Sequence, residues 1–238
     1  MVASAQAKEI RQYSITEHIS QFRVLRESGI LGTMHTTGRI FEDLKEYRRE
    51  FSRVDVSQHP GMELRMGLEV DFLPQHEAGI GEFVNQEEWD VLLCSVHELK
   101  GMVDVESPRP EGQDPAEARK QWHEYFGLQR MALESDFIPF AVLTHPVRMA
   151  KVTDLVPDDM DDLLLDLAKA ARKRGKALEL NGKDLDNSPG LVRRLAMACS
   201  KAGCSVSLGS DSHRPQEVFR NMNEAMALVE EFDLQLGK

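Results

Sequence analysis

Histidine and carboxylate residues recur at the ends of short apolar runs along this chain of 238 residues. Such side chains are ligands for divalent metal ions, and a carboxylate can bridge two ions. A single histidine in such a place is more often an ordinary core or surface residue than a ligand. Four of the eight histidines at strand ends are harder to ascribe to chance, so we expect a multi-metal hydrolytic site. Its candidate ligands are His18, Glu69, His97, His145, Asp211 and His213.

Two segments carry most of this signal. Residues two apart in an extended chain point to the same side, so Asp211 and His213 can face one cavity; the alternative is a turn in which Asp211 caps the following helix. Glu69 interrupts an apolar run, where its charge would be costly to bury unless a metal ion compensated it. Asp71 shares the face of Glu69, and we weigh a role at the site equally with that of a solvated loop residue.

Apolar runs of strand length alternate with segments of helical periodicity, which predicts repeated βα units and a largely parallel sheet. We expect six strands, at residues 13–16, 64–70, 91–96, 140–143, 177–180 and 205–208. The expected helices are residues 3–12, 38–53, 78–85, 115–134, 158–174, 191–201 and 216–232. In a parallel α/β barrel the functional groups lie at the carboxyl ends of the strands. The candidate ligands and Asn181 all lie at or just after the carboxyl ends of the predicted strands.

Composition narrows the class of protein. No Ser/Gly-rich or Pro-rich linker divides the chain, so we expect one domain over residues 1–238. The formal net charge of −11 disfavours nucleic-acid binding. No apolar run approaches the roughly 20 residues that cross a bilayer, and the first residues are charged where a signal peptide needs an apolar core. We therefore expect a cytoplasmic protein that binds no membrane, with Cys94, Cys199 and Cys204 as reduced core residues.

Six segments resemble the PHP superfamily of metal-dependent phosphoesterases, most closely its histidinol-phosphate phosphatase branch. They are residues 14–18 (SITEH), 66–74 (MGLEVDFLP), 93–97 (LCSVH), 144–146 (THP), 178–181 (LELN) and 208–213 (LGSDSH), in the order that the family has them. The resemblance implies an α/β fold, a distorted seven-stranded (β/α)7 TIM-like barrel, with up to three divalent ions, typically zinc, manganese or iron.

The resemblance also implies roles for the candidate ligands. Glu69 would bridge the first two ions, and His97 and His145 would complete the second site. Asp211 would serve the first ion, and His18 with His213 would serve the third. Glu69, Asp211 and His213 are the expected catalytic residues.

In one respect the sequence departs from the family. Family members begin with a strand that carries a His-x-His motif, followed by a further histidine, and this sequence starts after that motif. We expect a barrel without its first strand, with only the second metal site complete and fewer ions bound. The other histidines, His35, His59, His76 and His123, are expected to be surface or loop residues rather than replacements. Three explanations are open: a start codon assigned too far downstream, a natural truncation, or a strand supplied by a partner.

The resemblance implies hydrolysis of a small phosphate monoester, most closely of L-histidinol phosphate to L-histidinol and phosphate in histidine biosynthesis. Arg148, Lys151, Lys183 and Arg214 are candidates for binding the phosphate, although each could equally be a solvated surface charge. The alternatives are a phosphoesterase for another phosphomonoester or a nucleotide, and a non-catalytic barrel that binds a metal or a partner. The proline-rich loop at residues 106–115 could flank a substrate. The oligomeric state and the metals are left open.

Overall fold

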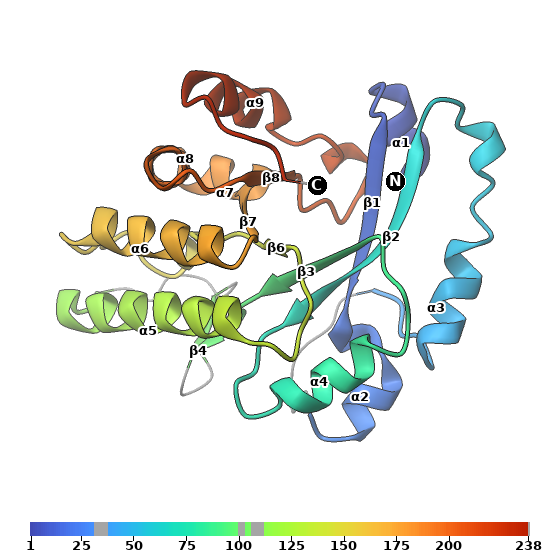
Figure 1. Cartoon of the computed structure of the whole chain (residues 1–238), viewed down its shortest axis with the longest axis horizontal. Helices are drawn as coiled ribbons and strands as arrows, with labels where there is room; N and C mark the ends of the chain where they lie inside the picture. The colour runs from blue at the N-terminus through green and yellow to red at the C-terminus, as the bar shows by residue number, and fades with distance from the viewer. Residues whose placement is uncertain (31–37, 100–102, 106–111, 238) are drawn as a thin grey trace.

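The sheet of this protein is parallel and strongly curled. A computed structural model describes residues 1–30, 38–99, 103–105 and 112–237 (Figure 1). Its six-stranded sheet has the order β1 (Gln12–His18), β2 (Glu63–Asp71), β3 (Val91–Ser95), β6 (Val142–Leu143), β7 (Ala177–Asn181) and β8 (Val206–Gly209). The predicted α/β class and the six strands are confirmed. The strands form a curled half-barrel, one strand short of the seven that the resemblance implies.

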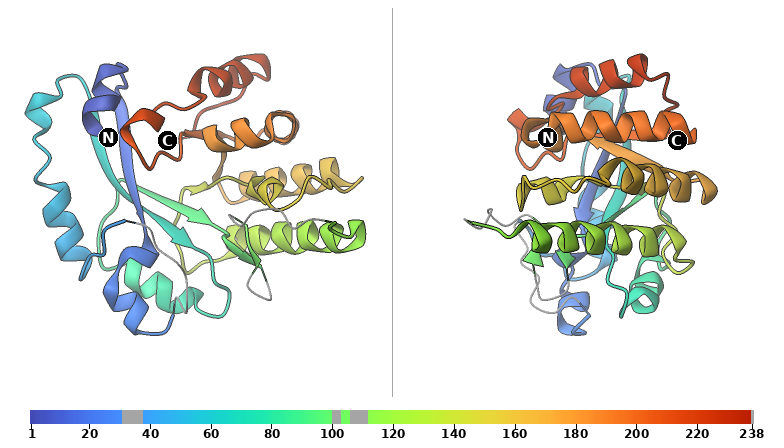
Figure 2. Two further views of the ribbon diagram at one scale, coloured as in Figure 1. Left: turned by 180° about the vertical axis from the view of Figure 1, so that it is seen from behind. Right: turned by 90° about the vertical axis from the view of Figure 1, so that its left-hand side faces the viewer.

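Three long helices lie side by side along the outer side of the half-barrel, as the two further views also show (Figure 2). They are α5 (Pro115–Glu134), α6 (Met160–Lys173) and α8 (Pro189–Ala202). Both α5 and α8 begin with proline, which is favoured in the first turn because that turn has no hydrogen-bond partner for the missing N–H. α8 ends at Gly203, whose φ of 64° is the left-handed conformation of a helix cap. These local signals explain why the sequence predicts the three helices closely.

The remaining elements are short. The other helices are α1 (Val2–Ala7), α2 (Arg23–Glu27), α3 (Leu44–Phe51), α4 (Glu77–Val84), α7 (Gly182–Asn187) and α9 (Met222–Glu231). Single 3-10 turns occur at η1 (Ile19–Gln21), η2 (Val56–Gln58), η3 (Arg148–Lys151) and η4 (Pro215–Glu217), and β4 (Glu98–Leu99) pairs with β5 (Val103–Asp104). No helix in the described ranges combines the length and the apolar character that a membrane span requires.

Several predicted boundaries were wrong. The predicted helix at residues 3–12 ends at Ala7, because Gln12 already pairs with Glu63 of β2. The helix predicted at 38–53 begins only at Leu44, where the Asp43 side chain accepts a hydrogen bond from the backbone N–H of Glu46. Short helices α2 and α7 were not predicted.

The closing helix also starts later than predicted. It was expected over residues 216–232, but the chain first makes the 3-10 turn η4 and α9 begins only at Met222. Phe219 and Asn221 have φ values of 69° and 51°, which no regular helix allows. Of the predicted loop at residues 106–115, residues 106–111 lie outside the described residues, as does His35.

The core lies between the sheet and the helices. Leu68, Leu178 and Leu180 of the strands are completely buried, as are Trp122 and Tyr125 of α5. The three cysteines are free and buried, as predicted.

Strand register decides which residues meet at the carboxyl edge of the sheet. His18 pairs with Glu69, and Asp71 pairs with Ser95. On the other side of the half-barrel, Asn181 pairs with Gly209. Side chains from six separate strand ends therefore converge on one region.

Candidate metal centre

The carboxylate of Glu69 is surrounded by three histidine side chains. Its Oε2 atom lies 3.7 Å from His18 Nδ1. Its Oε1 atom lies 3.4 Å from His97 Nε2 and 3.0 Å from His145 Nε2. The structure thus brings together four of the six candidate ligands.

The charge of Glu69 is held in an almost dry environment, with only 8% of the residue exposed. Burial alone would raise its pKa, but the charge of His18, the hydrogen bond with His145 and the charges of His145 and His97 lower the pKa well below its ordinary value. Glu69 is therefore a carboxylate that cations stabilise, as a metal ligand has to be.

His97 is oriented from behind by a second carboxylate. Its Nδ1 atom makes a short contact with Asp71 Oδ1 and lies 3.3 Å from Ser95 Oγ, which leaves Nε2 directed at Glu69. Burial would lower the pKa of His97, but Asp71 and then Glu69 raise it to about 9. Asp71 is 2% exposed, so of the two roles weighed from the sequence, the solvated loop residue is excluded. A carboxylate behind a histidine is the usual support of a histidine ligand.

His145 is held by its backbone. Its φ of 34° lies in the left-handed region, which costs energy for a side chain of this kind. The backbone N–H donates to Glu179 Oε2 at 2.9 Å, and the carbonyl accepts from the Tyr125 hydroxyl at 3.1 Å. Burial, followed by the charge of Arg148, lowers the pKa of His145. A lowered pKa favours the unprotonated imidazole, which is the form that binds a metal ion.

Asp211 and His213 lie across the cavity from β1. Asp211 also has a left-handed φ, of 49°. Its carboxylate accepts a hydrogen bond of 2.7 Å from Arg148 and lies 3.6 Å from Lys183 Nζ. Burial would raise the pKa of Asp211, but Arg148, His145 and Lys183 lower it. The His213 side chain is 49% exposed, and its ring stacks against that of His18 with centroids 6.2 Å apart.

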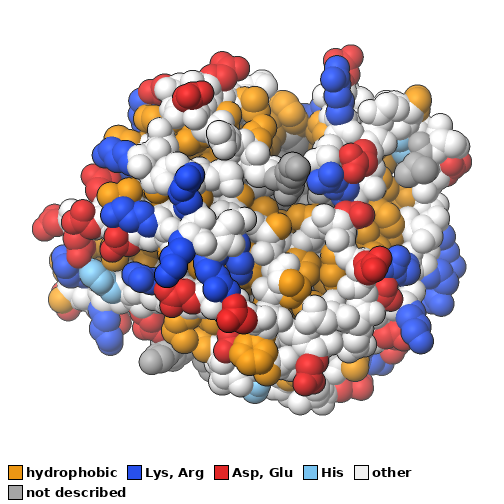
Figure 3. Space-filling model, viewed as in Figure 1, with side chains coloured by type: hydrophobic (Ala, Val, Ile, Leu, Met, Phe, Trp, Pro, Cys, Tyr) orange, Lys and Arg blue, Asp and Glu red, His pale blue; other side chains and the backbone are white. Residues whose placement is uncertain are grey.

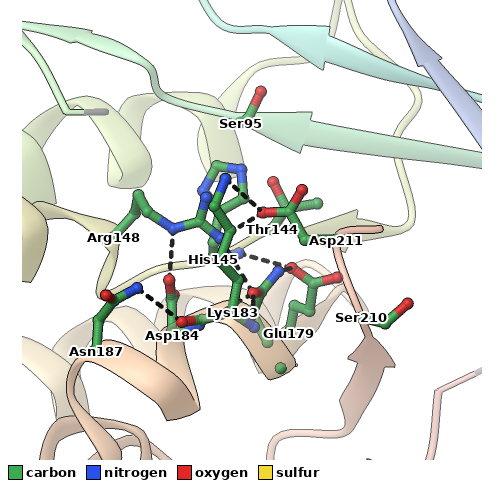
Figure 4. A network of polar contacts seen from close by, with 12 residues as sticks. Ser95, Thr144, His145, Arg148, Glu179, Lys183, Asp184, Asn187, Ser210 and Asp211 are labelled. Carbon is green, nitrogen blue, oxygen red and sulfur yellow. Dashed lines mark hydrogen bonds and ion pairs between the residues drawn. The ribbon is translucent and has the colours of Figure 1, made fainter. Parts of the chain in front are cut away.

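Arg148 follows His145 in the chain, and its backbone N–H donates to the His145 carbonyl while its side chain is directed at Asp184 and Asp211 (Figure 4). Only 1% exposed, its guanidinium donates to Asn181 Oδ1 at 3.0 Å, to Asp211 and, at short range, to Asp184. Asn181 in turn caps α7 by accepting from the backbone N–H groups of Lys183 and Asp184. A rigid, positively charged fork is therefore fixed beside the cluster.

Glu179 is a site residue that the sequence analysis missed. It accepts from the His145 backbone and from the Asn181 amide, and burial raises its pKa to about 7. A Cβ atom on Gly209 would overlap the Glu179 carboxylate, so any larger residue there would force Glu179 to move. The signal was present, because Glu179 interrupts the apolar strand β7 as Glu69 interrupts β2.

The predicted phosphate-binding residues lie in different surroundings. Arg148 and Lys183 both contact Asp211. Lys151 is the last residue of the 3-10 turn that begins at Arg148. Arg214 directly follows His213 in the sequence and is exposed. All four assignments stay predictions.

A cavity of about 730 Å³ reaches the cluster from the space between the edge strands β1 and β8. His18, Glu69 and His145 line one part of it, and Asp211 and His213 line another. This volume can hold a small phosphorylated molecule beside the histidines.

The donor set fits a divalent metal ion. One ligand atom each from His18, Glu69 and His97 lies within 4.8 Å of the others. His145 Nδ1 is buried and has no hydrogen-bond partner among the described residues. Imidazole nitrogens around a carboxylate suit zinc, manganese or iron.

Three of the histidines that were predicted to be surface or loop residues are described by the structure. His123 is exposed and contacts Asp159 at 3.1 Å, while His59 and His76 are half-buried in or beside loops and turns. None of these three is part of the cluster that the described residues form.

Comparison with known proteins gives a family match and two curated relatives. The PHP domain family matches residues 1–183. A protein of Deinococcus radiodurans named "Probable histidinol-phosphatase" is 28% identical over 186 residues, which cover 74% of this chain and 68% of the relative. The histidinol-phosphatase of Lactococcus lactis is 21% identical over 192 residues, which cover 79% of this chain and 71% of the relative.

Two solved structures share the fold. The Lactococcus lactis histidinol phosphate phosphatase, crystallised with zinc, L-histidinol and phosphate, has a TM-score of 0.77 at 19% identity and is matched over 99% of this chain and 87% of its own. A protein from Listeria monocytogenes, named as a candidate histidinol phosphatase, has a TM-score of 0.74 at 19% identity, over 94% of this chain and 92% of its own. At this identity the two structures support the barrel-type fold.

Proposed function

This chain belongs to the PHP domain family, and on that premise we propose that it is a metal-dependent phosphatase that hydrolyses L-histidinol phosphate to L-histidinol and phosphate. One observation carries the proposal. The Glu69 carboxylate lies among His18, His97 and His145 at the carboxyl ends of the strands, beside a cavity large enough for a small substrate.

The histidine cluster is the proposed metal centre, with Glu69, His97 and His145 as its core and His18 beside them. A bound divalent ion lowers the pKa of a coordinated water molecule and offsets the charge of a phosphoryl group. Asp71 keeps His97 oriented through Nδ1, and Glu179 holds the His145 backbone. We propose that Asp211 and His213 complete the site from the opposite side.

Arg148 and Lys183 are the proposed phosphate-binding residues. Both are directed at Asp211, so their positive charges already meet at one point of the site. Asp184 and Asn181 accept hydrogen bonds from Nε and Nη2 of Arg148 and fix the plane of its guanidinium, so we propose that Arg148 acts on the phosphate through its positive charge beside Asp211. Such preorganisation stabilises charge without reorganisation during the reaction.

His213 is the proposed proton donor to the departing alcohol. Its side chain is 49% exposed, while its Nδ1 atom lies 3.2 Å from the Asp211 carbonyl oxygen. We propose that the imidazolium form donates from Nδ1 to that carbonyl oxygen and carries on Nε2 the proton that the alcohol takes. A positioned histidine that gives its proton to a leaving group typically accelerates the reaction 10²- to 10⁴-fold.

The choice of substrate rests on the names of the relatives, which are histidinol phosphatases. An assay of the full chain against a panel of phosphate monoesters, with manganese or zinc added, tests it. The proposal expects L-histidinol phosphate to have the highest kcat/KM. A flat preference over the panel would support a general phosphomonoesterase instead.

The rival hypothesis of a non-catalytic barrel is tested by metal analysis of the purified chain. Two or more ions per chain would contradict it, as would phosphate release that depends on Glu69. One ion or none, without turnover of any phosphate in the panel, would contradict the phosphatase.

A further inference from the structure

A second cluster of cationic side chains lies at the amino-terminal ends of β6 and β7, at the end of the sheet opposite the histidines. Lys173 is the last residue of α6, Arg174 follows it, and Lys176 directly precedes β7. These three residues line an open pocket of about 350 Å³ together with Ser135, Asp136, Ile138 and Pro139. Lys and Arg side chains gather where α6 ends in the face shown in Figure 3. The proposed reaction uses none of them.

The amine of Lys176 is in an unusual environment. The residue is only 8% exposed, and its Nζ atom lies 3.4 Å from the centroid of the Phe140 ring. Within the part of the chain that the structure describes, this buried Nζ has no hydrogen-bond partner. A buried ammonium group without hydrogen bonds is unfavourable, and the cation–π contact with Phe140 offsets only part of that cost, so the ammonium form is less favoured than in an exposed lysine.

The pKa of Lys176 is lowered accordingly. Burial lowers the pKa of Lys176 most; Cys94 and Asp136 raise it and Arg174 lowers it, and the resulting pKa is about 8. An ordinary lysine has a pKa near 10.4. The fraction of neutral amine at about pH 8 is therefore about 100-fold larger for Lys176 than for an ordinary lysine. Only the neutral amine is a nucleophile.

The other two cations are placed to attract an anion. Lys173 and Arg174 are exposed at the rim, and Arg174 is partly neutralised by the exposed Asp136. Cations at the carboxyl end of a helix also interact favourably with its dipole, which is enough to explain these two residues structurally. That explanation leaves the hydrogen-bond-free amine beside the pocket unexplained.

We propose that Lys176 is an acylation site at which the pocket takes a small acyl phosphate. Lys173 and Arg174 attract the phosphate group, and the neutral Nζ attacks the acyl carbon. A C–N bond forms, the C–O bond to phosphate breaks, and inorganic phosphate leaves with the bonding electron pair. The nitrogen releases its proton to water, which leaves a neutral acyl-lysine.

The side chain must turn toward the pocket for this reaction. This movement breaks no hydrogen bond of Nζ among the described residues, but it gives up the contact with the Phe140 ring and part of the burial of the side chain. The pocket volume of about 350 Å³ exceeds what an acetyl group requires. The product carries no charge, so the cost of burying an ammonium group disappears.

The test treats the full chain with acetyl phosphate at about pH 8 and follows acetylation of each lysine by peptide mass spectrometry. A chelator is present so that turnover at the histidine cluster does not consume the reagent. Lys169, on α6 with a side chain 60% exposed, is the internal reference. Weaker bases are weaker nucleophiles, so part of the gain from the neutral fraction is lost, and we expect Lys176 to react about tenfold faster than Lys169. Equal or slower modification of Lys176 would overturn the proposal.

Recognition of the phosphate is tested separately. Lys173→Ala should slow acetylation of Lys176 at least about threefold, whereas Lys201→Ala, at the last turn of α8, should leave it unchanged. Excess inorganic phosphate should compete at Lys176 and not at Lys169. The uncharged reagent N-hydroxysuccinimide acetate should not respond to Lys173→Ala. If Lys173→Ala and phosphate both leave the Lys176 rate unchanged, the pocket does not recognise acyl phosphates and the proposal fails.

Discussion

The Nε2 atom of His145 lies 3.0 Å from Oε1 of Glu69, although 76 residues separate them in the sequence. Glu69 is on β2 and His145 follows β6, with β3 between them in the sheet. The contact is made possible by the curl of the sheet and by the left-handed backbone of His145. The contact at the centre of the site thus depends on the curl of the sheet across β2, β3 and β6.

Glu69→Gln is expected to abolish tight metal binding, because the amide keeps the shape of the side chain but loses the charge that binds the ion. We expect metal content per chain to fall and kcat/KM to drop about 100-fold or more. Elemental analysis and the phosphate assay measure these effects. The matched control is Glu63→Gln at the exposed start of the same strand, where both quantities should stay at the wild-type level. Full metal content in Glu69→Gln would contradict the assignment.

Gly209→Ala should destabilise the fold, because the added Cβ overlaps the Glu179 carboxylate, which supports the His145 backbone. We expect the free energy of unfolding to fall by about 1–3 kcal/mol. Gly190→Ala is the control, since a Cβ there meets no atom within 4 Å and alanine favours the helix. Urea unfolding of both variants checks this. Equal stability of the two variants would show that Glu179 moves away without cost.

Arg148→Met should cost about 3–5 kcal/mol of stability, because it leaves the carboxylates of Asp184 and Asp211 without their buried partner. Arg130→Ala removes an exposed ion pair with Glu134 and should change stability by less than about 1 kcal/mol. Denaturant melts measure both changes. If both variants lose less than about 1 kcal/mol of unfolding free energy, Arg148 does not compensate the charges of Asp184 and Asp211.

The metal-free protein should become less stable as the pH rises from about 7 to about 8.5. The folded-state pKa of His97 is raised to about 9, so its stabilising contribution is complete below its unfolded pKa of about 6.5 and is lost as the pH approaches 9. His97 alone would cost about 1–2 kcal/mol over this range; Lys176, whose pKa is lowered to about 8, offsets part of this cost, so the expected net loss is about 1 kcal/mol. Urea unfolding in the presence of a chelator measures it.

Asp71→Asn serves as the comparison in that experiment, because Asp71 is the group that raises the pKa of His97 most. The slope of stability against pH should flatten in this variant. A slope equal to that of the wild type would mean that another group titrates.

Much of the site could be predicted because its ligands break a local pattern. Glu69 interrupts an apolar strand, and His18 and His145 come within two residues of the ends of predicted strands, so each is visible without knowledge of its neighbours. The strands themselves follow from runs of apolar residues, which are buried on both faces in a parallel sheet.

The supporting network could not be predicted because its partners are distant in the sequence. Arg148 meets Asn181, Asp184 and Asp211, which lie 33, 36 and 63 residues further along the chain. Nothing near Arg148 distinguishes it from Lys151, which was predicted with it. The late start of α9 was hidden for a related reason, since Phe219 adopts a positive φ that its residue type does not favour.

The position of β1 at the edge of the sheet has a consequence for the metal centre. In the described part of the chain, β1 pairs with β2 along one side, and its other side faces the cavity. A strand hydrogen-bonded on one side opens more readily than a central one, so its amide protons should exchange with solvent faster than those of β2. His18 ends this strand. An ion that uses His18 as a ligand would therefore depend in part on an edge strand, so slower exchange of the β1 amide protons when metal is added would show that the ion stabilises this edge.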